Sequence, residues 1–285
     1  MDLQALIDNP LPDREQDYDV RDTILYALGL GYGHDPDATD ELLYTYEKNL
    51  QAVPTMACVL AHPGFWYQNP NYKVDWVKLL HGGQTIEMVR PLPPSGRVKA
   101  SYKVISVDDK GAEKGAVLTQ EKVLSDAVSG GLIGRIRSVT VLRGDGGCGS
   151  FGDKAPAVLK PPQGDPPVVV DVPTSLQAAL LYRLNGDLNP IHADPEIARK
   201  AGFPRPILHG LCTMGVACRG LLATLCDDDP MRLARMSVRF TKPVFPGETL
   251  RLEAWPGGTN ILFRLRAVER DLLVMDSCEA TLRAA

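Results

Sequence analysis

The apolar positions of the chain form helical runs followed by strand-like runs, and this order occurs twice. Residues 18–30 (YDVRDTILYALGL) carry apolar side chains at helical spacing, so an amphipathic helix is expected there. A second helical stretch is expected at 39–46. Alternating, strand-like stretches follow at 98–107, 116–124 and 136–142 in the first half, and at 249–255, 260–268 and 273–282 in the second.

Two short motifs also recur, one copy in each half. LLHG at 79–82 resembles ILHG at 207–210. RPLPPSG at 90–96 resembles KPVFPG at 242–247, since both carry two prolines three positions apart and then a glycine. Because strand-like stretches follow in the same order, these motifs indicate an internal duplication.

The stretch at 143–167 lies between the two copies and is rich in Gly, Pro, Lys and Asp, a composition typical of a linker or surface excursion. We therefore expect an N-terminal repeat at 1–150, a linker at 151–165 and a C-terminal repeat at 166–285. Helices placed ahead of runs of strands favour an α+β fold.

Composition narrows the class of protein. A length of 285 residues is enough for two domains with cores, and a net charge of -4 gives no reason to expect nucleic acid. The six cysteines show no metal-ligand spacing, which favours reduced thiols. No apolar run reaches the ~18 residues of a membrane span. The acidic start lacks a signal-peptide core, and the final RAA differs from a Ser-Lys-Leu peroxisomal address. A cytoplasmic protein with no membrane partner is expected.

The candidate chemistry lies at 186–192, GDLNPIH. Gly186 and Pro190 favour a tight turn, which can bring the carboxylate of Asp187 and the imidazole of His192 to one water molecule. Acid–base catalysis requires two such groups within hydrogen-bond reach of the same proton. Asp-x-Asn-Pro alone is also an ordinary Asx turn, and a lone histidine such as His209 is more often structural.

The wider stretch 182–214, YRLNGDLNPIHADPEIARKAGFPRPILHGLCTM, resembles the hydratase 2 motif of the MaoC-like dehydratases, the R-specific enoyl-CoA hydratases. The resemblance runs through Tyr182, Leu184, the GDLNPIH segment and Ala198. The chain departs from the motif at Asn185, where the family usually has a small residue. Asp194 with Pro195 reads as the start of a short helix.

The resemblance implies a double hot-dog fold, in which each repeat is an antiparallel sheet wrapped around a central helix. In the second half this helix would begin at about Leu208. The first half would hold an equivalent helix, but no Asp-x-Asn-Pro-x-His precedes its His81-Gly82. Only the second half can then carry the chemistry, and the first would bind the acyl chain and CoA.

The function implied is reversible addition of water to trans-2-enoyl-CoA, giving (3R)-3-hydroxyacyl-CoA in fatty-acid metabolism. Asp187 and His192 would hold the water between them, and Asn189 would orient it. The backbone N–H of Gly210, at a helix start, would stabilise the thioester oxyanion. No metal and no cofactor are implied beyond the CoA thioester, which is the substrate.

The resemblance also implies substrate contacts and an assembly. Within the motif they fall on Leu188, Pro190 and Ile191, and elsewhere on His81, Gly82, Lys110 and Phe240. Lys110 could equally be a solvated turn lysine, and Phe240 a strand core residue. A homodimer is expected by analogy, because hot-dog proteins commonly pair their sheets.

Three alternatives stay open. A thioesterase of the same fold would release free CoA, although it would lack the Asn-Pro-x-His arrangement. A second alternative is a dehydratase for another acyl group, such as an enoyl carrier-protein ester or an intermediate of sterol breakdown. The third is a non-catalytic acyl-CoA-binding module, against which the intact Asp187, Asn189 and His192 argue.

Overall fold

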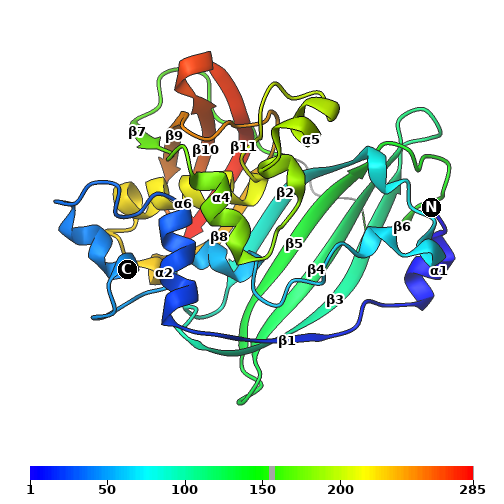
Figure 1. Ribbon diagram of the computed structural model, residues 1–285, viewed down its shortest axis with the longest axis horizontal. Coiled ribbons are helices and arrows are strands. Elements are labelled where there is room, and N and C mark those ends of the chain that lie inside the picture. The colour runs from blue at the N-terminus through cyan, green and yellow to red at the C-terminus, as the bar shows by residue number, and fades with distance from the viewer. Residues whose placement is uncertain (154–157, 285) are drawn as a thin grey trace.

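A computed structural model describes residues 1–153 and 158–284 as one antiparallel sheet that curves around helices (Figure 1). The strands are β1 (Arg14–Tyr18), β2 (Leu79–Met88), β3 (Gly96–Asp109), β4 (Ala116–Asp126), β5 (Leu132–Leu142), β6 (Phe151–Gly152), β7 (Val168–Pro173), β8 (Leu233–Arg239), β9 (Thr249–Gly257), β10 (Asn260–Ala267) and β11 (Leu272–Leu282). The α-helices are α1 (Leu3–Asp8), α2 (Val20–Gly29), α3 (Leu42–Thr45), α4 (Ala178–Tyr182), α5 (Pro195–Lys200) and α6 (Gly210–Leu225).

The strand order shows the duplication directly. It reads β1-β3-β4-β5-β2 for the first half and continues β8-β11-β10-β9-β7 for the second, so the two halves mirror each other about the β2–β8 pair. That pair is antiparallel, with Ile86 opposite Met236. Both side chains are fully buried, so the two sheets share a core where they meet. The double hot-dog architecture expected from the sequence is confirmed.

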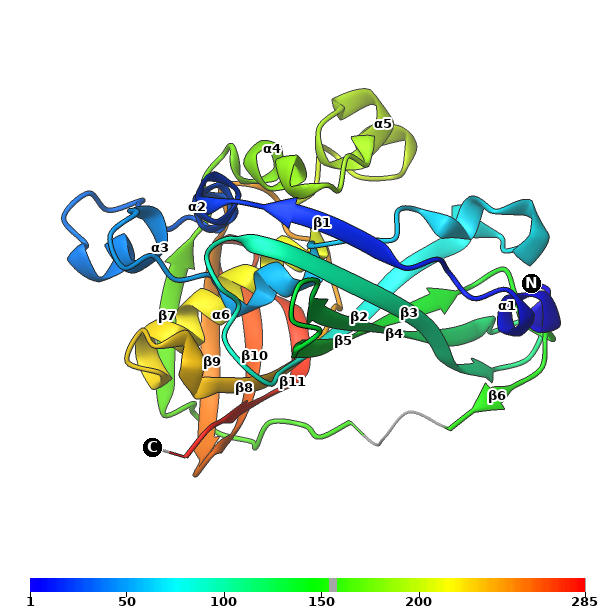
Figure 2. The same cartoon turned by 90° about the horizontal axis from the view of Figure 1, so that it is seen from below.

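In the second half, α6 lies against the concave side of β7 to β11 (Figure 2). Residues 212–218 of this helix are buried, as expected for a helix enclosed by protein, and its one charged residue, Arg219, pairs with Glu41 of the first half. Gly215 lets α2 of the first half approach, because a Cβ there would stand 2.3 Å from Leu30 Cδ2. The helix therefore packs against both halves.

In the first half, the corresponding place before the sheet holds only a short 3₁₀ helix, η2 (Pro54–Cys58), which contacts α6. Lys122 on β4 is buried, and its ammonium donates to three carbonyl oxygens at the C-terminal end of η2. The acceptors are Ala57 at 2.7 Å, Cys58 at 2.9 Å and Leu60 at 2.9 Å. One lysine thus satisfies backbone acceptors that a longer helix would have bonded internally.

The prediction of a helix after His81-Gly82 is wrong, because this stretch is strand β2. Pairing with β5 and β8 decides its conformation, and β2 carries a bulge between His81 and Gly83. Gly83 is needed for that pairing, since a Cβ there would stand 2.8 Å from the Val238 carbonyl oxygen. The LLHG and ILHG stretches are therefore similar in sequence but differ in structure. The second repeated motif does occupy equivalent places in the two halves, since 90–96 and 242–247 lie in the matching β2–β3 and β8–β9 connections.

Other predicted elements are found with shifted ends. The six predicted strands correspond to β3, β4, β5, β9, β10 and β11. The helix at 18–30 is α2, whose N-cap Asp19 forms a capping box with Asp22. The stretch at 39–46 divides into a 3₁₀ turn, η1 (Thr39–Glu41), and α3. Strands β1, β2, β6, β7 and β8 were not predicted.

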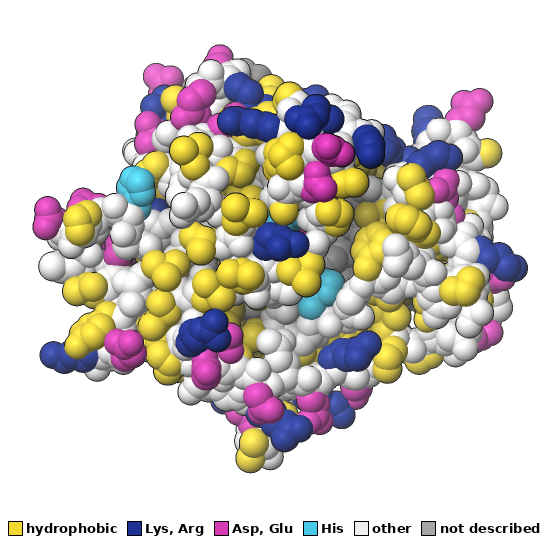
Figure 3. All heavy atoms as spheres, in the orientation of Figure 1, with side chains coloured by type: hydrophobic (Ala, Val, Ile, Leu, Met, Phe, Trp, Pro, Cys, Tyr) yellow, Lys and Arg dark blue, Asp and Glu magenta, His cyan; other side chains and the backbone are white. Residues whose placement is uncertain are grey.

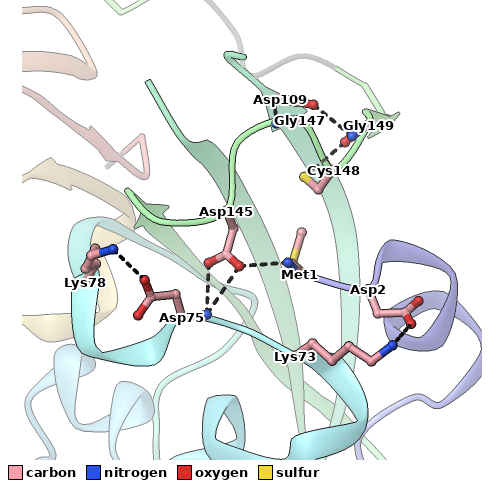
Figure 4. A network of polar contacts seen from close by, with 10 residues as sticks. All are labelled: Met1, Asp2, Lys73, Asp75, Lys78, Asp109, Asp145, Gly147, Cys148 and Gly149. Atoms are coloured by element: carbon pink, nitrogen blue, oxygen red, sulfur yellow. Dashed lines mark hydrogen bonds and ion pairs between the residues drawn. The ribbon is translucent and has the colours of Figure 1, made fainter. Parts of the chain in front are cut away.

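The glycine-rich stretch at 144–149, just before the predicted linker, is fixed by acidic side chains (Figure 4). Asp109 accepts hydrogen bonds from the N–H groups of Gly147 and Gly149 at 2.9 and 2.8 Å. Asp145 pairs with the amino group of Met1 at 2.8 Å and accepts from the N–H of Asp75. Residues 154–157 of the predicted linker and Ala285 lie outside the described residues, and the domain boundaries stay predictions. None of the described helices is both long and apolar enough to cross a membrane.

Candidate active site

The turn at 186–192 is built by its own side chains. A 3₁₀ helix, η6 (Arg183–Asn185), ends at Gly186 with φ of 115°, a conformation that favours glycine. The N–H of Asn189 donates to Asp187 Oδ1 at 3.2 Å, and the N–H of Ile191 donates to Asn189 Oδ1 at 3.2 Å. Asn189 is thereby the N-cap of η7 (Pro190–His192). Its side-chain oxygen shapes the turn between the acid and the base.

His192 is oriented by the segment that leads into α6. Its Nδ1 lies 2.8 Å from the Ile207 carbonyl oxygen, and the side chain is only 9% exposed. A carbonyl can only accept a hydrogen bond, so Nδ1 carries the proton and Nε2 keeps a free lone pair. Among the five histidines, this one combines a fixed tautomer with a free basic nitrogen beside a carboxylate.

The structure brings the predicted acid and base together. Side-chain atoms of Asp187, His192 and His209 all lie within 4.8 Å of one another. Asp187 is exposed, whereas the two histidines are mostly buried. A water molecule can therefore reach the carboxylate from solvent and meet an imidazole held behind it.

Burial and charge act in opposite directions on His192. Burial lowers the pKa of this imidazole, while the hydrogen bond to Ile207 and the charge of Asp187 raise it in part. His192 is consequently neutral at pH 7, the form that can accept a proton. An imidazolium formed during a reaction would be stabilised by the Asp187 carboxylate.

Gly210 is the first residue of α6, so its N–H belongs to the group that an α-helix leaves without an internal acceptor. No acceptor for it is recorded among the described residues. A Cβ at Gly210 would touch the ring of Phe240 at 3.4 Å. The N–H is thus available at the positive end of a 16-residue helix.

Three of the residues predicted to bind substrate meet at this same place. The N–H of Phe240 donates to the carbonyl oxygen of Gly82 at 3.1 Å. The rings of Phe240 and His81 are 4.9 Å apart between centroids in an edge-to-face contact. His81 is held by Gln84, whose Oε1 lies 3.0 Å from its Nε2. The first half therefore supplies one wall next to Gly210.

The remaining predicted contacts divide into two groups. Leu188 and Pro190 are exposed on the turn at 186–192, and Ile191 is half-buried there. Lys110 lies in the exposed turn after β3, where its ammonium pairs with Asp108. The structure does not bring Lys110 to the other site residues, as the solvated-turn interpretation expected.

Two histidines near the site were not predicted. His209 was interpreted as structural, although it stands directly before Gly210. His62, in the loop after η2, interacts electrostatically with Asp187 and His81. It reaches solvent, yet the surrounding protein and the charge of Lys122 lower its pKa to about 4. No pattern in the sequence around His62 signals this position. The face of the molecule drawn in Figure 3 is hollowed near its middle, with a histidine side chain at the edge of the hollow.

The donor set of Asp187, His192 and His209 is a poor fit for a metal ion. The two imidazole rings are stacked, with centroids 3.6 Å apart and planes inclined by 25°. Lone pairs in the planes of stacked rings run side by side and do not converge on one ion. The nitrogen of His209 that is not bonded to a backbone carbonyl, Nδ1, is also buried. This arrangement favours hydrogen bonding to water.

A surface cavity of about 680 Å³ lies elsewhere, at the N-terminal corner, with Met1, Lys73 and Cys148 among its lining residues. Neither a histidine nor any residue of the turn at 186–192 lines this cavity. The acid–base pair therefore identifies the candidate active site, and this cavity is separate from it.

Comparisons with known proteins concern the family and the fold of the chain. Residues 158–277 match the MaoC like domain, and residues 16–144 match the MFE-2 hydratase 2 N-terminal domain. Enoyl-CoA hydratase 2, peroxisomal, of Arabidopsis thaliana is 37% identical, with 95% of this chain and 92% of the relative covered. A MaoC-like dehydratase from Phytophthora capsici has a TM-score of 0.88 at 33% identity, with all of both chains covered. Full-length peroxisomal multifunctional enzyme type 2 from Drosophila melanogaster has a TM-score of 0.82 at 36% identity, with 95% of this chain and 48% of that chain covered.

Proposed function

The chain belongs to the MaoC-like hydratase 2 family, and from this premise we propose that it is an R-specific 2-enoyl-CoA hydratase. This hydro-lyase adds water reversibly to trans-2-enoyl-CoA and gives (3R)-3-hydroxyacyl-CoA, a step of fatty-acid β-oxidation. The observation that carries the proposal is the meeting of Asp187 with a neutral His192 whose Nε2 is free.

In the proposed reaction, one water molecule lies between the Asp187 carboxylate and His192 Nε2. Nε2 takes a proton from the water as its oxygen bonds to C3 of the enoyl group, and the C2–C3 π electrons move toward the thioester. The imidazolium then gives that proton to C2. Asp187 accepts a hydrogen bond from the second O–H of the water, which stays intact as the product hydroxyl, and stabilises the transient imidazolium. One O–H bond is broken, C3–O and C2–H bonds are formed, and both side chains return to their starting state.

The negative charge that develops on the thioester oxygen needs a donor in a fixed place. The N–H of Gly210 supplies it, with the partial positive charge of the α6 N-terminus behind it. We assign His81, Gly82 and Phe240 to the wall that holds the acyl thioester, because they adjoin Gly210. Leu188, Pro190 and Ile191 contact it from the turn. A role for Lys110 would require CoA to reach the β3–β4 turn.

The direct test is the loss of enoyl absorbance with crotonyl-CoA and longer trans-2-enoyl-CoAs, followed by chiral analysis of the product. The R product is expected, and its rate across chain lengths will define the acyl group that the first half accepts. An S-configured product would overturn the family assignment of the chemistry.

Two competing functions are separated by the same samples, and a third is separated by other thioester substrates. A thioesterase would release free thiol, which a thiol reagent detects as the absorbance falls. A non-catalytic acyl-CoA-binding module would bind these thioesters without any change in absorbance, and Asp187→Ala would then leave the measured rate untouched. A dehydratase for other acyl groups would prefer an enoyl carrier-protein ester or a sterol-derived thioester over fatty enoyl-CoA.

We also propose a cytoplasmic homodimer in which the C-terminal repeat is catalytic and the N-terminal repeat binds the acyl chain and CoA. The relatives named above include peroxisomal proteins, so the location should be tested by fractionation of the native cell. The sheet pairing that motivates a dimer is met within one chain by β2 and β8. A second copy would therefore bind through another surface. The molar mass measured by light scattering will distinguish a monomer from a dimer.

A further inference from the structure

His209 contacts both members of the acid–base pair, although the proposed reaction does not use it. It is the N-cap residue of α6 and is only 1% exposed. Its ring stacks on that of His192 with centroids 3.6 Å apart. Its Nε2 lies 3.2 Å from the backbone carbonyl oxygen of Asp187. One side chain therefore touches the ring of the base and the backbone of the acid.

The hydrogen bond to Asp187 determines the tautomer of His209. Because the carbonyl oxygen accepts, Nε2 must carry the proton and Nδ1 must bear the lone pair. Nδ1 is buried and has no partner among the described residues. A proton on Nδ1 would therefore be buried without an acceptor, which is costly.

The surroundings also oppose a positive charge on His209. The imidazole lies at the N-terminus of α6, where the helix dipole is positive, and against a second imidazole. Burial, with the neighbouring His192, lowers the pKa of His209 to about 4. His209 is thus neutral at pH 7, and because its Nε2 is bonded to the Asp187 carbonyl and its Nδ1 is buried, neither nitrogen is placed to exchange protons with the reactants.

His209 is in turn held from the core by a series of ring contacts. The ring of Tyr182 on α4 lies 5.1 Å from that of His209, and the ring of Tyr26 on α2 lies 5.6 Å from that of Tyr182. The hydroxyl of Tyr26 donates to Thr55 Oγ1 in η2 at 3.0 Å. Both halves of the molecule therefore contribute to the position of His209.

We propose that His209 is a positioning residue for the hydration reaction: it fixes the Asp187 backbone by hydrogen bonding and the His192 ring by stacking, at the spacing that one water molecule bridges. This inference rests on the proposed function. A displacement of about 1 Å between reacting groups can reduce a rate on the order of a hundredfold. A rigid, neutral His209 that holds Asp187 and His192 in place therefore increases the rate of hydration.

Two variants separate the two contacts. His209→Phe keeps a flat ring for stacking and removes the donor to Asp187, whereas His209→Gln keeps a donor and removes the ring. Each is expected to lower kcat roughly tenfold to a hundredfold while KM changes less than about threefold, since the substrate wall is untouched. His34→Gln and His34→Phe are matched controls on an exposed loop histidine, and wild-type rates are expected.

A purely structural role predicts another result. The folded variants would then melt at lower temperature but keep a kcat within about twofold of the wild type, and that outcome would overturn the proposal. A large rise in KM with an unchanged kcat would also overturn it, because it would make His209 a binding residue.

The wild-type protein gives a second test that needs no stable variant. In ¹⁵N-histidine NMR spectra at pH 7, His209 is expected as the neutral Nε2–H tautomer and His192 as the neutral Nδ1–H tautomer. Detection of a protonated or Nδ1–H form of His209 would contradict the proposal. If the wild type fails to hydrate any enoyl-CoA, the proposed function fails, whereas the tautomer measurement still reports on the His209 bond independently.

Discussion

The two halves of the molecule share a strand order and differ in what fills the curve of the sheet. The second half encloses the 16-residue helix α6, whose N-terminus lies beside the turn at 186–192 and carries the N–H of Gly210, which has no acceptor among the described residues. The first half has the five-residue η2 in the corresponding place, ended by Lys122. The same sheet can thus be completed by a long helix or by a short turn with a buried lysine. Only the helix supplies an anion-stabilising terminus next to the acid and the base.

The comparison of the two halves assigns the acid–base chemistry to the second half. Substitutions of the acid and the base test this assignment and should have the largest effect on the rate. Asp187→Asn and His192→Gln should each lower kcat/KM by on the order of a thousandfold, the range of general acid–base catalysis. His34→Gln makes the same change at an exposed first-half histidine and should leave the rate unchanged. Steady-state hydration assays measure all three, and a near-normal rate in Asp187→Asn would break the comparison.

The second prediction concerns the substitute for the helix in the first half. Lys122→Met leaves the carbonyl oxygens of Ala57, Cys58 and Leu60 buried without their donor, so the free energy of unfolding should fall by about 2 kcal/mol. Lys103→Met, an exposed lysine on β3, is the matched control and should stay within about 0.5 kcal/mol of the wild type. Urea denaturation measures both, and equal stabilities would show that η2 does not depend on Lys122.

The third prediction concerns the contact between Gly210, at the start of α6, and Phe240 in the wall assigned to the acyl thioester. Gly210→Ala places a methyl group against the Phe240 ring, at 3.4 Å, and so narrows the approach of the thioester oxygen to the Gly210 N–H; kcat/KM should fall about tenfold while the melting temperature holds, since Ala is a better helix former. Phe240→Leu in the same chain should restore part of the rate. Failure of the second substitution to restore any activity would mean that steric contact with Phe240 is not the cause.

The smallest expected effect is on stability as pH falls. The folded-state pKa of His209 is lowered to about 4, whereas an unfolded histidine titrates near ~6.5. The unfolded chain therefore binds more protons in this window, and stability should decrease as pH falls from about 6.5 toward 4. His62 in the first half has a similarly lowered pKa but reaches solvent, so it contributes less. His209→Phe should flatten the decrease, and an unchanged slope would contradict this assignment.

The sequence predicted the strands that follow each turn motif, because alternation and glycine turns are local signals. It did not predict β2, since LLHGG has no alternation and its conformation depends on β5 and β8 lying on either side. The acid–base pair was predicted because Asp187, Asn189 and His192 lie within one turn. His62 and Lys122 come from distant segments and meet the site or η2 only in the fold. Contacts of single residues from distant segments produce no periodic pattern in the sequence, so they cannot be predicted from it.

The most direct test of the central claim is to offer both enantiomers of 3-hydroxybutyryl-CoA to the wild type and to Asp187→Asn and to follow dehydration by the appearance of enoyl absorbance. We predict that the wild type converts only the R enantiomer and that Asp187→Asn, folded to the same melting temperature, converts neither at a comparable rate. Conversion of the S enantiomer, or an undiminished rate in the variant, would contradict the assignment of the chemistry to this turn.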